Sequence, residues 1–314
     1  MILSLLLLPI FGESWAQELP ITNSSSIVYD SGISLMNIGE INEKSGTYWL
    51  DFFFYMKSNN VDFTQEIPEI VFMNARDIEI GESHVTTNYY EIRVRGDFAT
   101  QLDFEKFPYE RHELVVEIEP KIPYDSSQFV FDNNVENSID SDMKISSNFK
   151  MFDSNVKTIS HTYFDGLEFS RIIATYTVGP EPIGSTLKTI LPVTMIVGIS
   201  LMIFFIPEHY TPRIYLTAPL LLAAVYWHQS SLAHLPSLGY ATIFDRIMIL
   251  YYLLFVNSIL SLAVQMRVSA KDKNDIRAKK YNRIFSYSTI AILVYVVIRI
   301  ITDEGTWSKD SIFS

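Results

Sequence analysis

Four long apolar stretches fill the C-terminal part of the chain, at residues 186–206, 212–233, 241–266 and 284–301. A helix of about 20 residues, rising about 1.5 Å per residue, crosses the roughly 30 Å hydrocarbon core of a bilayer. The pattern therefore predicts a transmembrane domain of four helices over residues 185–303. The connector 207–211 is so short that the first two helices should form a tight hairpin.

A different periodicity precedes these stretches. Residues 17–184 contain short runs rich in β-branched and aromatic side chains, several of them alternating with polar residues, as at 48–56 and 171–178. Glycine and asparagine residues that favour turns separate the runs. Many short strands without helical periodicity predict an immunoglobulin-like β-sandwich of about 160 residues. The expected fold class is an α+β membrane protein.

The second apolar stretch is unusual because it carries polar side chains. Polar groups at membrane depth are costly unless they meet a partner or water. Six of its residues follow one another at steps of four and three, so they share one helical face. They are Tyr215, Pro219, Leu222, Tyr226, Gln229 and Ala233. Several copies of this face around an axis would line a pore, and the alternative is an ordinary helix buried inside a bundle.

The distribution of charge predicts the orientation. The connector 267–283 is rich in Lys and Arg, which places it in the cytoplasm by the positive-inside rule. Four spans then put both termini, including the tail 304–314, outside the cell membrane. An apolar run followed by small residues predicts a signal peptide at residues 1–16, and the alternative is a buried terminal strand.

Composition excludes several function classes. The chain has 314 residues, a formal net charge of −12 and no cysteine. The acidic balance disfavours nucleic acid as a partner, and thiol chemistry is excluded. We find no Gly-rich phosphate loop, no His/Cys metal cluster and no nucleophile elbow, and the histidines are scattered. We therefore expect a protein that is not an enzyme and that uses no cofactor and no metal.

One segment indicates a family. Residues 95–120 read RGDFATQLDFEKFPYERHELVVEIEP, and the core Phe107-Pro108-Tyr109-Glu110 resembles the Phe-Pro-Phe-Asp loop of pentameric ligand-gated ion channels. The resemblance is to the prokaryotic members of this Cys-loop receptor superfamily, because Thr100 and Leu114 replace the two loop cysteines. Further similar motifs follow at residues 68–74, 169–172, 190–192 and 235–240.

The resemblance implies a homopentamer in the lipid membrane, with five sandwiches outside and five second helices lining an ion pore. A ring of Leu222 residues would form a hydrophobic gate that blocks ions by dewetting, with Tyr226 narrowing the pore above it. The loop Phe107–Glu110 would press on the connector around Pro236 and so couple ligand binding to opening.

Selectivity for monovalent ions is expected at the inner mouth of the pore, where Glu208 and Arg213 lie. The usual acidic residue is missing beside Arg213, so we expect Glu208 to favour cations, and an anion-selective channel is the alternative. Pro219 and Pro180 depart from the family pattern on the pore face and before the first span.

The resemblance also implies a ligand site between neighbouring sandwiches, built from aromatic rings and carboxylates. Such a box binds by cation–π attraction and charge-assisted hydrogen bonds. One subunit would supply Glu119, Tyr163, Phe164 and Phe169, with Lys121 either neutralising Glu119 or pointing to solvent. The neighbour would supply Phe53, Tyr90 and Glu91. We expect a small polar ligand, an amine or an amino acid, with protons as a rival agonist through His161. The alternatives are that these aromatics only pack an interface, or that the protein is a non-conducting solute sensor.

Overall fold

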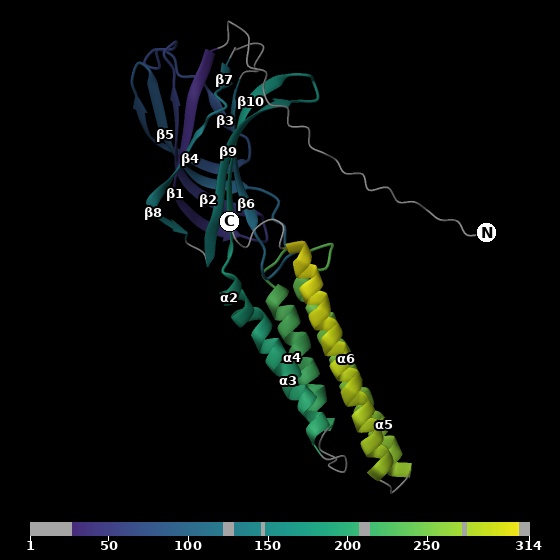
Figure 1. Ribbon diagram of the computed structural model, residues 1–314. Helices are drawn as coiled ribbons and strands as arrows, with labels where there is room; N and C mark the ends of the chain where they lie inside the picture. Colours follow the sequence, from purple (N-terminus) through teal and green to yellow (C-terminus); the bar gives the residue numbers. More distant parts are fainter. Residues whose placement is uncertain (1–26, 122–128, 146–147, 207–213, 272–274, 308–314) are drawn as a thin grey trace, which may run out of the picture. The chain divides into compact units, whose positions relative to one another are not determined.

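The computed structural model describes residues 27–121, 129–145, 148–206, 214–271 and 275–307 (Figure 1). The chain divides into two compact units, one formed by Met1–Leu102 with His112–Val178 and the other by Asp103–Arg111 with Gly179–Ser314. The predicted signal peptide, Glu208 and Arg213 lie outside the described residues, as do residues 308–314 of the predicted tail.

The first unit consists of two sheets. The larger has the order β4-β5-β2-β1-β7, with β8 also paired to β1, and the smaller has the order β3-β6-β10-β9. β7 and β8 pair with β1 in parallel, whereas the register of β1 with β2 is antiparallel. The strands of the larger sheet are β1 (Ile27–Asn42), β2 (Thr47–Lys57), β4 (Ala75–Val85), β5 (Tyr89–Ala99), β7 (Phe129–Phe131) and β8 (Glu136–Ile145). Those of the smaller are β3 (Ile70–Phe72), β6 (His112–Pro120), β9 (Phe149–Thr162) and β10 (Glu168–Pro180). The predicted β-rich N-terminal domain is confirmed.

Alternation along the strands creates the core of this unit. On β2, Leu50, Phe52 and Phe54 are fully buried, and on β6 Leu114 and Val116 are equally inaccessible. Each such side chain contributes about 1.5–3 kcal/mol by leaving water. The Phe52 ring meets the Phe72 ring of the other sheet edge-on at 5.9 Å, a geometry that aromatic pairs favour.

The second unit is helical. Its elements are α2 (Pro182–Ser185), the π-helical turn η1 (Thr186–Ile190), α3 (Leu191–Leu201), the 3₁₀ turn η2 (Met202–Phe205), α4 (Ile214–Leu232), α5 (Ile243–Lys271) and α6 (Asp275–Trp307). The first four form one helical stretch. Helices therefore occur at all four predicted spans, and α4 stays helical on both sides of Pro219.

Two of the four predicted spans stand out by their length and hydropathy. Among the described residues, Pro182–Phe205 and Ile243–Ser269 are the stretches that are long and apolar enough to cross a membrane. Polar residues near the end of α4, among them His228, Gln229 and Ser230, lower the mean hydropathy of that helix. Most of the basic segment 267–283 is helical too. Helical hydrogen bonding can continue beyond an apolar run, so the end of such a run does not predict the end of a helix.

Candidate functional site

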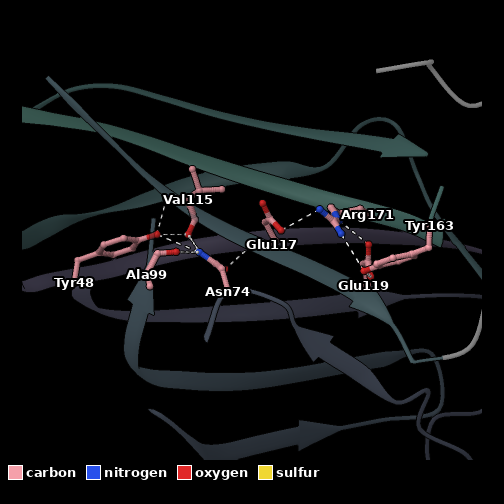
Figure 2. A network of polar contacts seen from close by, with 8 residues as sticks. All are labelled: Tyr48, Asn74, Ala99, Val115, Glu117, Glu119, Tyr163 and Arg171. Carbon is pink, nitrogen blue, oxygen red and sulfur yellow. Dashed lines mark hydrogen bonds and ion pairs between the residues drawn. The ribbon is translucent and has the colours of Figure 1, made fainter. Parts of the chain in front are cut away.

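A polar cluster occupies the smaller sheet where β6 and β10 pair (Figure 2). Glu117 and Glu119 alternate along β6, so they point to the same side of the sheet. Arg171 of β10 reaches both: its Nε donates to Glu119 Oε1 at 2.5 Å and its Nη1 to Glu117 Oε2 at 3.0 Å. The Glu119 side chain is only 3% exposed, so this guanidinium balances a carboxylate that has lost most of its water.

Tyr163 completes the cluster from the loop after β9. Its hydroxyl donates to Glu119 Oε2 at 2.9 Å and accepts from Arg171 Nη2 at 3.1 Å. Burial, and then the hydrogen bond from Tyr163 to Glu119, raise the pKa of the phenol, which therefore remains a donor. Gly166, at φ +83°, allows the turn that brings the loop back.

Aromatic rings surround Tyr163. The His161 ring packs edge-on at 4.6 Å and the Phe169 ring at 5.3 Å. Phe164 is fully exposed and contributes nothing to this packing. The structure thus brings together Glu119, Tyr163 and Phe169, three residues predicted for the ligand site, and leaves Phe164 apart from them.

Lys121 does not neutralise Glu119. Its Nζ pairs with Glu69 at 2.5 Å, and both side chains are more than half exposed, so it takes the solvent-facing alternative. Sequence reasoning missed Arg171 and Glu117 as the partners in this cluster. A signal was present, because Arg171 is a charged residue that directly precedes the apolar residues Ile172 and Ile173 of its strand.

A second polar cluster lies on the outward face of the larger sheet. Asp51 accepts two hydrogen bonds from Arg93, at 2.8 and 2.7 Å, and lies 3.5 Å from Arg95. The Arg93 guanidinium also lies over the Phe53 ring, 5.2 Å from its centroid. Burial raises the pKa of Asp51, but the hydrogen bonds and charge of Arg93, together with the charge of Arg95, more than offset this, so that the pKa lies below its usual value.

The residues predicted for the neighbour's half of the site are only partly together. Phe53 pairs with Arg93 and Tyr55 with Glu91, so Phe53 and Glu91 share the outward face of the larger sheet. Tyr90 points to the other face, where its ring stacks with Phe63 at 6.2 Å. Phe53 and Glu119 belong to different sheets of this chain.

Exposure divides α4 into two faces. Tyr215, Leu222 and Tyr226 are 76%, 70% and 73% exposed. Pro219, Gln229 and Ala233 are exposed as well, so all six predicted pore-lining residues are accessible in the single chain. Thr217 and Ala224 on the opposite face are buried.

The inward face of α4 is anchored near its C-terminal end. The Trp227 indole donates to the Thr189 carbonyl at 3.0 Å. His228 Nε2 lies 2.8 Å from Asp245 of α5, and its Nδ1 lies 3.0 Å from the Tyr252 hydroxyl. His228 therefore has partners inside the bundle, which explains its position off the exposed face.

The loop Asp103–Arg111 packs onto the connection between α4 and α5. The carbonyls of Glu105 and Phe107 accept from the backbone nitrogens of Ile243 and Phe244 at 3.0 and 3.1 Å. The buried Phe107 ring lies 5.9 Å from that of Phe244. The backbone nitrogen of Phe104 donates to the Tyr240 hydroxyl at 3.0 Å.

The other residues predicted for coupling, Pro108, Tyr109, Glu110 and Pro236, lie in different surroundings. The Tyr109 hydroxyl is 2.8 Å from that of Thr186. Pro108 follows a cis peptide bond and is buried, as is Glu110. Pro236 lines an open groove of about 500 Å³, with Tyr240 and Asp245 also in its wall.

Neither a scan of protein-family models nor a search of curated proteins found a match for this chain. Within the described ranges, no group of three or more His, Asp or Glu residues has a geometry that could hold a metal ion. The case for a function therefore rests on the two polar clusters, the exposed face of α4 and the loop Asp103–Arg111.

Proposed function

We propose that this chain is one subunit of a homopentameric ligand-gated ion channel in the cell membrane, with the sandwich and both termini outside. A small ligand binds between neighbouring sandwiches, and the second helix of each subunit lines a cation-conducting pore. The proposal extends the resemblance of the loop Asp103–Arg111 to the channel family.

The exposed face of α4 is the observation that carries this proposal. A helix that uses one face to pack on its own bundle and leaves Tyr215, Leu222 and Gln229 accessible needs another surface or water on that side. Five copies around an axis would bring the Leu222 side chains into one apolar ring, and such a ring blocks ions by dewetting. The polar residues of the same face would then line the aqueous pore.

The loop Asp103–Arg111 supplies a route for coupling. Two backbone hydrogen bonds and the packing of Phe107 on Phe244 join it to the start of α5. The Phe244 ring in turn packs edge-on against His228 of α4, at 5.4 Å. A displacement of the loop would therefore reach the pore helix through contacts that already exist, as a two-state switch requires.

The charges of the two clusters favour an amino acid as the ligand. Glu117, Glu119 and Arg171 comprise two carboxylates and one guanidinium, which leaves one negative charge. Beside Phe53, the second cluster has two guanidiniums, Arg93 and Arg95, against the one carboxylate of Asp51, and Glu91 lies further along the same face. If these faces meet across a subunit interface, a zwitterion complements both through charge-assisted hydrogen bonds.

Single-channel recording in a bilayer tests this function. Purified protein is exposed to a panel of amino acids, matched amines that lack the carboxylate, and pH steps. We expect unitary currents that an amino acid evokes and that Phe169→Ala weakens. Phe164→Ala is the matched control, because Phe164 lies outside the aromatic cluster. Protein that is correctly assembled but never conducts would favour the non-conducting sensor.

Protons remain a second candidate agonist because His161 packs directly on Tyr163, the phenol that binds Glu119. A positive charge on His161 would alter this cluster without any organic ligand. If acid alone evokes currents and His161→Gln abolishes them, the agonist is the proton and not an amino acid. Reversal potentials in asymmetric salt distinguish cation from anion conduction, and Glu208→Gln tests the residue expected to set it.

A further inference from the structure

Three buried hydroxyl groups in the helical unit have no hydrogen-bond partner among the described residues. They belong to Ser200 of α3, Thr217 of α4 and Ser258 of α5, which are 0%, 1% and 0% exposed. An unpaired hydroxyl is unfavourable in a dry interior, because the alternative partner, bulk water, is absent. Three on three different helices suggest a shared partner.

A hydrogen bond from α4 to the helical turn before α3 allows the axial positions of two of these hydroxyls to be compared. The Trp227 indole of α4 donates to the carbonyl of Thr189, just before α3. Ser200 follows Thr189 by about eleven residues, and Thr217 precedes Trp227 by about ten. At about 1.5 Å per residue these are roughly 16 and 15 Å along the two helices. Since the chain reverses between α3 and α4, both steps lead in the same direction.

Further contacts between α5 and its neighbours give the axial position of the third hydroxyl. The hydroxyls of Thr194 on α3 and Tyr251 on α5 are 2.8 Å apart. Ser200 follows Thr194 by about six residues, and Ser258 follows Tyr251 by about seven, so both lie roughly 10 Å further along. The bonds from His228 to Asp245 and Tyr252 join α4 to α5. From these bonds, Thr217 on α4 and Ser258 on α5 both lie towards the N-terminal end of α4.

We propose that Ser200, Thr217 and Ser258 bind one buried water molecule between α3, α4 and α5. All three side chains are buried, and α3, α4 and α5 pack against one another, so the interior between these helices is where the three hydroxyls would meet. A buried water typically makes about three hydrogen bonds, and three hydroxyls can each donate or accept as required. The three carry no charge, so the site suits water rather than an ion.

The water site divides α4 into two differently attached halves. Near its C-terminal end the helix is held by direct bonds from Trp227 and His228. Near its N-terminal end the contact runs through an exchangeable molecule, which can follow small shifts of the helix without breaking a direct bond between helices. This inference does not depend on ion conduction, because it concerns the attachment of α4 to its own bundle.

The direct test is a structure of the full chain in lipid nanodiscs at a resolution that shows ordered water. We expect a density peak within hydrogen-bonding distance of all three hydroxyl oxygens. If instead each hydroxyl donates to a carbonyl of its own helix and no peak lies between them, the proposal is overturned.

A mutant cycle gives an independent test. Ser200→Ala, Thr217→Val and Ser258→Ala are made singly and together, and thermal unfolding is followed in detergent. Each single change should lower the melting temperature by about 2–4 °C, because the water and the other two hydroxyls lose a partner. The triple variant should lose clearly less than the three losses combined, because no polar group remains to be satisfied.

Ser261→Ala is the matched control. Ser261 is also buried on α5, but its hydroxyl accepts from Gln265 at 2.7 Å. Its effect should therefore add to that of each of the other three changes. Strict additivity among Ser200, Thr217 and Ser258 would contradict a shared water, even if the triple variant folds normally.

Discussion

At the scale of single residues, Arg171 joins two carboxylates of the smaller sheet. It balances Glu119, whose side chain is 3% exposed, while its own side chain is 11% exposed. Removing one partner of a buried pair leaves an uncompensated charge, and this costs more than the net contribution of the pair itself. The cluster thus holds the loop that carries Tyr163 against the sheet.

We therefore expect Arg171→Met to reduce the free energy of unfolding by about 3–5 kcal/mol. The double variant with Glu119→Gln should recover part of this loss, because the buried charge is gone. Lys121→Met is the control, since its pair with Glu69 is exposed and should contribute less than about 1 kcal/mol. Denaturant unfolding measures all three, and equal effects of Arg171→Met and Lys121→Met would contradict this account.

Asp51 should make the thermal stability of the protein depend on pH. Its folded pKa lies below its usual value, so its contribution is present above the unfolded pKa of about 3.9 and is lost as pH falls through the folded pKa. Asp51→Asn should therefore lower the melting temperature at neutral pH, and the difference from the parent should shrink below about pH 4. A difference that stays constant down to pH 2 would show that charge is not responsible.

At the scale of elements, α4 combines two environments in one helix. Its inward residues are buried or bonded to α3 and α5, while Leu222 and Tyr226 are largely exposed. If the proposed pore exists, Leu222→Ser should wet the apolar ring and raise basal current or ligand sensitivity. Leu216→Ser is the control, because Leu216 is an accessible leucine outside the six-residue face. If currents are unchanged in correctly assembled Leu222→Ser protein, Leu222 does not form the gate.

The loop Asp103–Arg111 is the second element with a defined attachment. The Tyr240 hydroxyl accepts from the backbone nitrogen of Phe104 and donates to Asp103 at 3.1 Å. Tyr240→Phe removes both bonds, each worth about 0.5–1.5 kcal/mol. Amide hydrogen exchange should become faster in residues 103–111 and remain unchanged in β2. Equal protection of the loop in parent and variant would show that Tyr240 does not hold it.

At the scale of the whole molecule, the exposed face of α4 predicts assembly. We expect the solubilised protein to have the mass of a homopentamer, because five copies would cover this face and bring Phe53 of one sandwich towards Glu119 of the next. Native mass spectrometry or light scattering measures the mass directly. A stable monomer or dimer that retains ligand binding would rule out the pentamer while leaving the sandwich site intact.

The sequence alone determined the features that depend on neighbours along the chain. Alternation in residues 48–56 follows from the two-residue period of a strand, and steps of three and four place Leu222 and Tyr226 on one helical face. Apolar length likewise indicated where helices lie. These patterns need no knowledge of distant residues, because backbone geometry alone decides which side chains share a face.

Only the tertiary structure decided which distant groups meet. Arg171 and Glu119 are 52 residues apart, and strand register, rather than proximity in sequence, selected Arg171 over the nearby Lys121. His228 likewise finds Asp245 through the packing of two helices. The loop Asp103–Arg111 connects two strands, yet packing assigns it to the helical unit. Partner choice depends on how whole elements align, and no local period encodes that alignment.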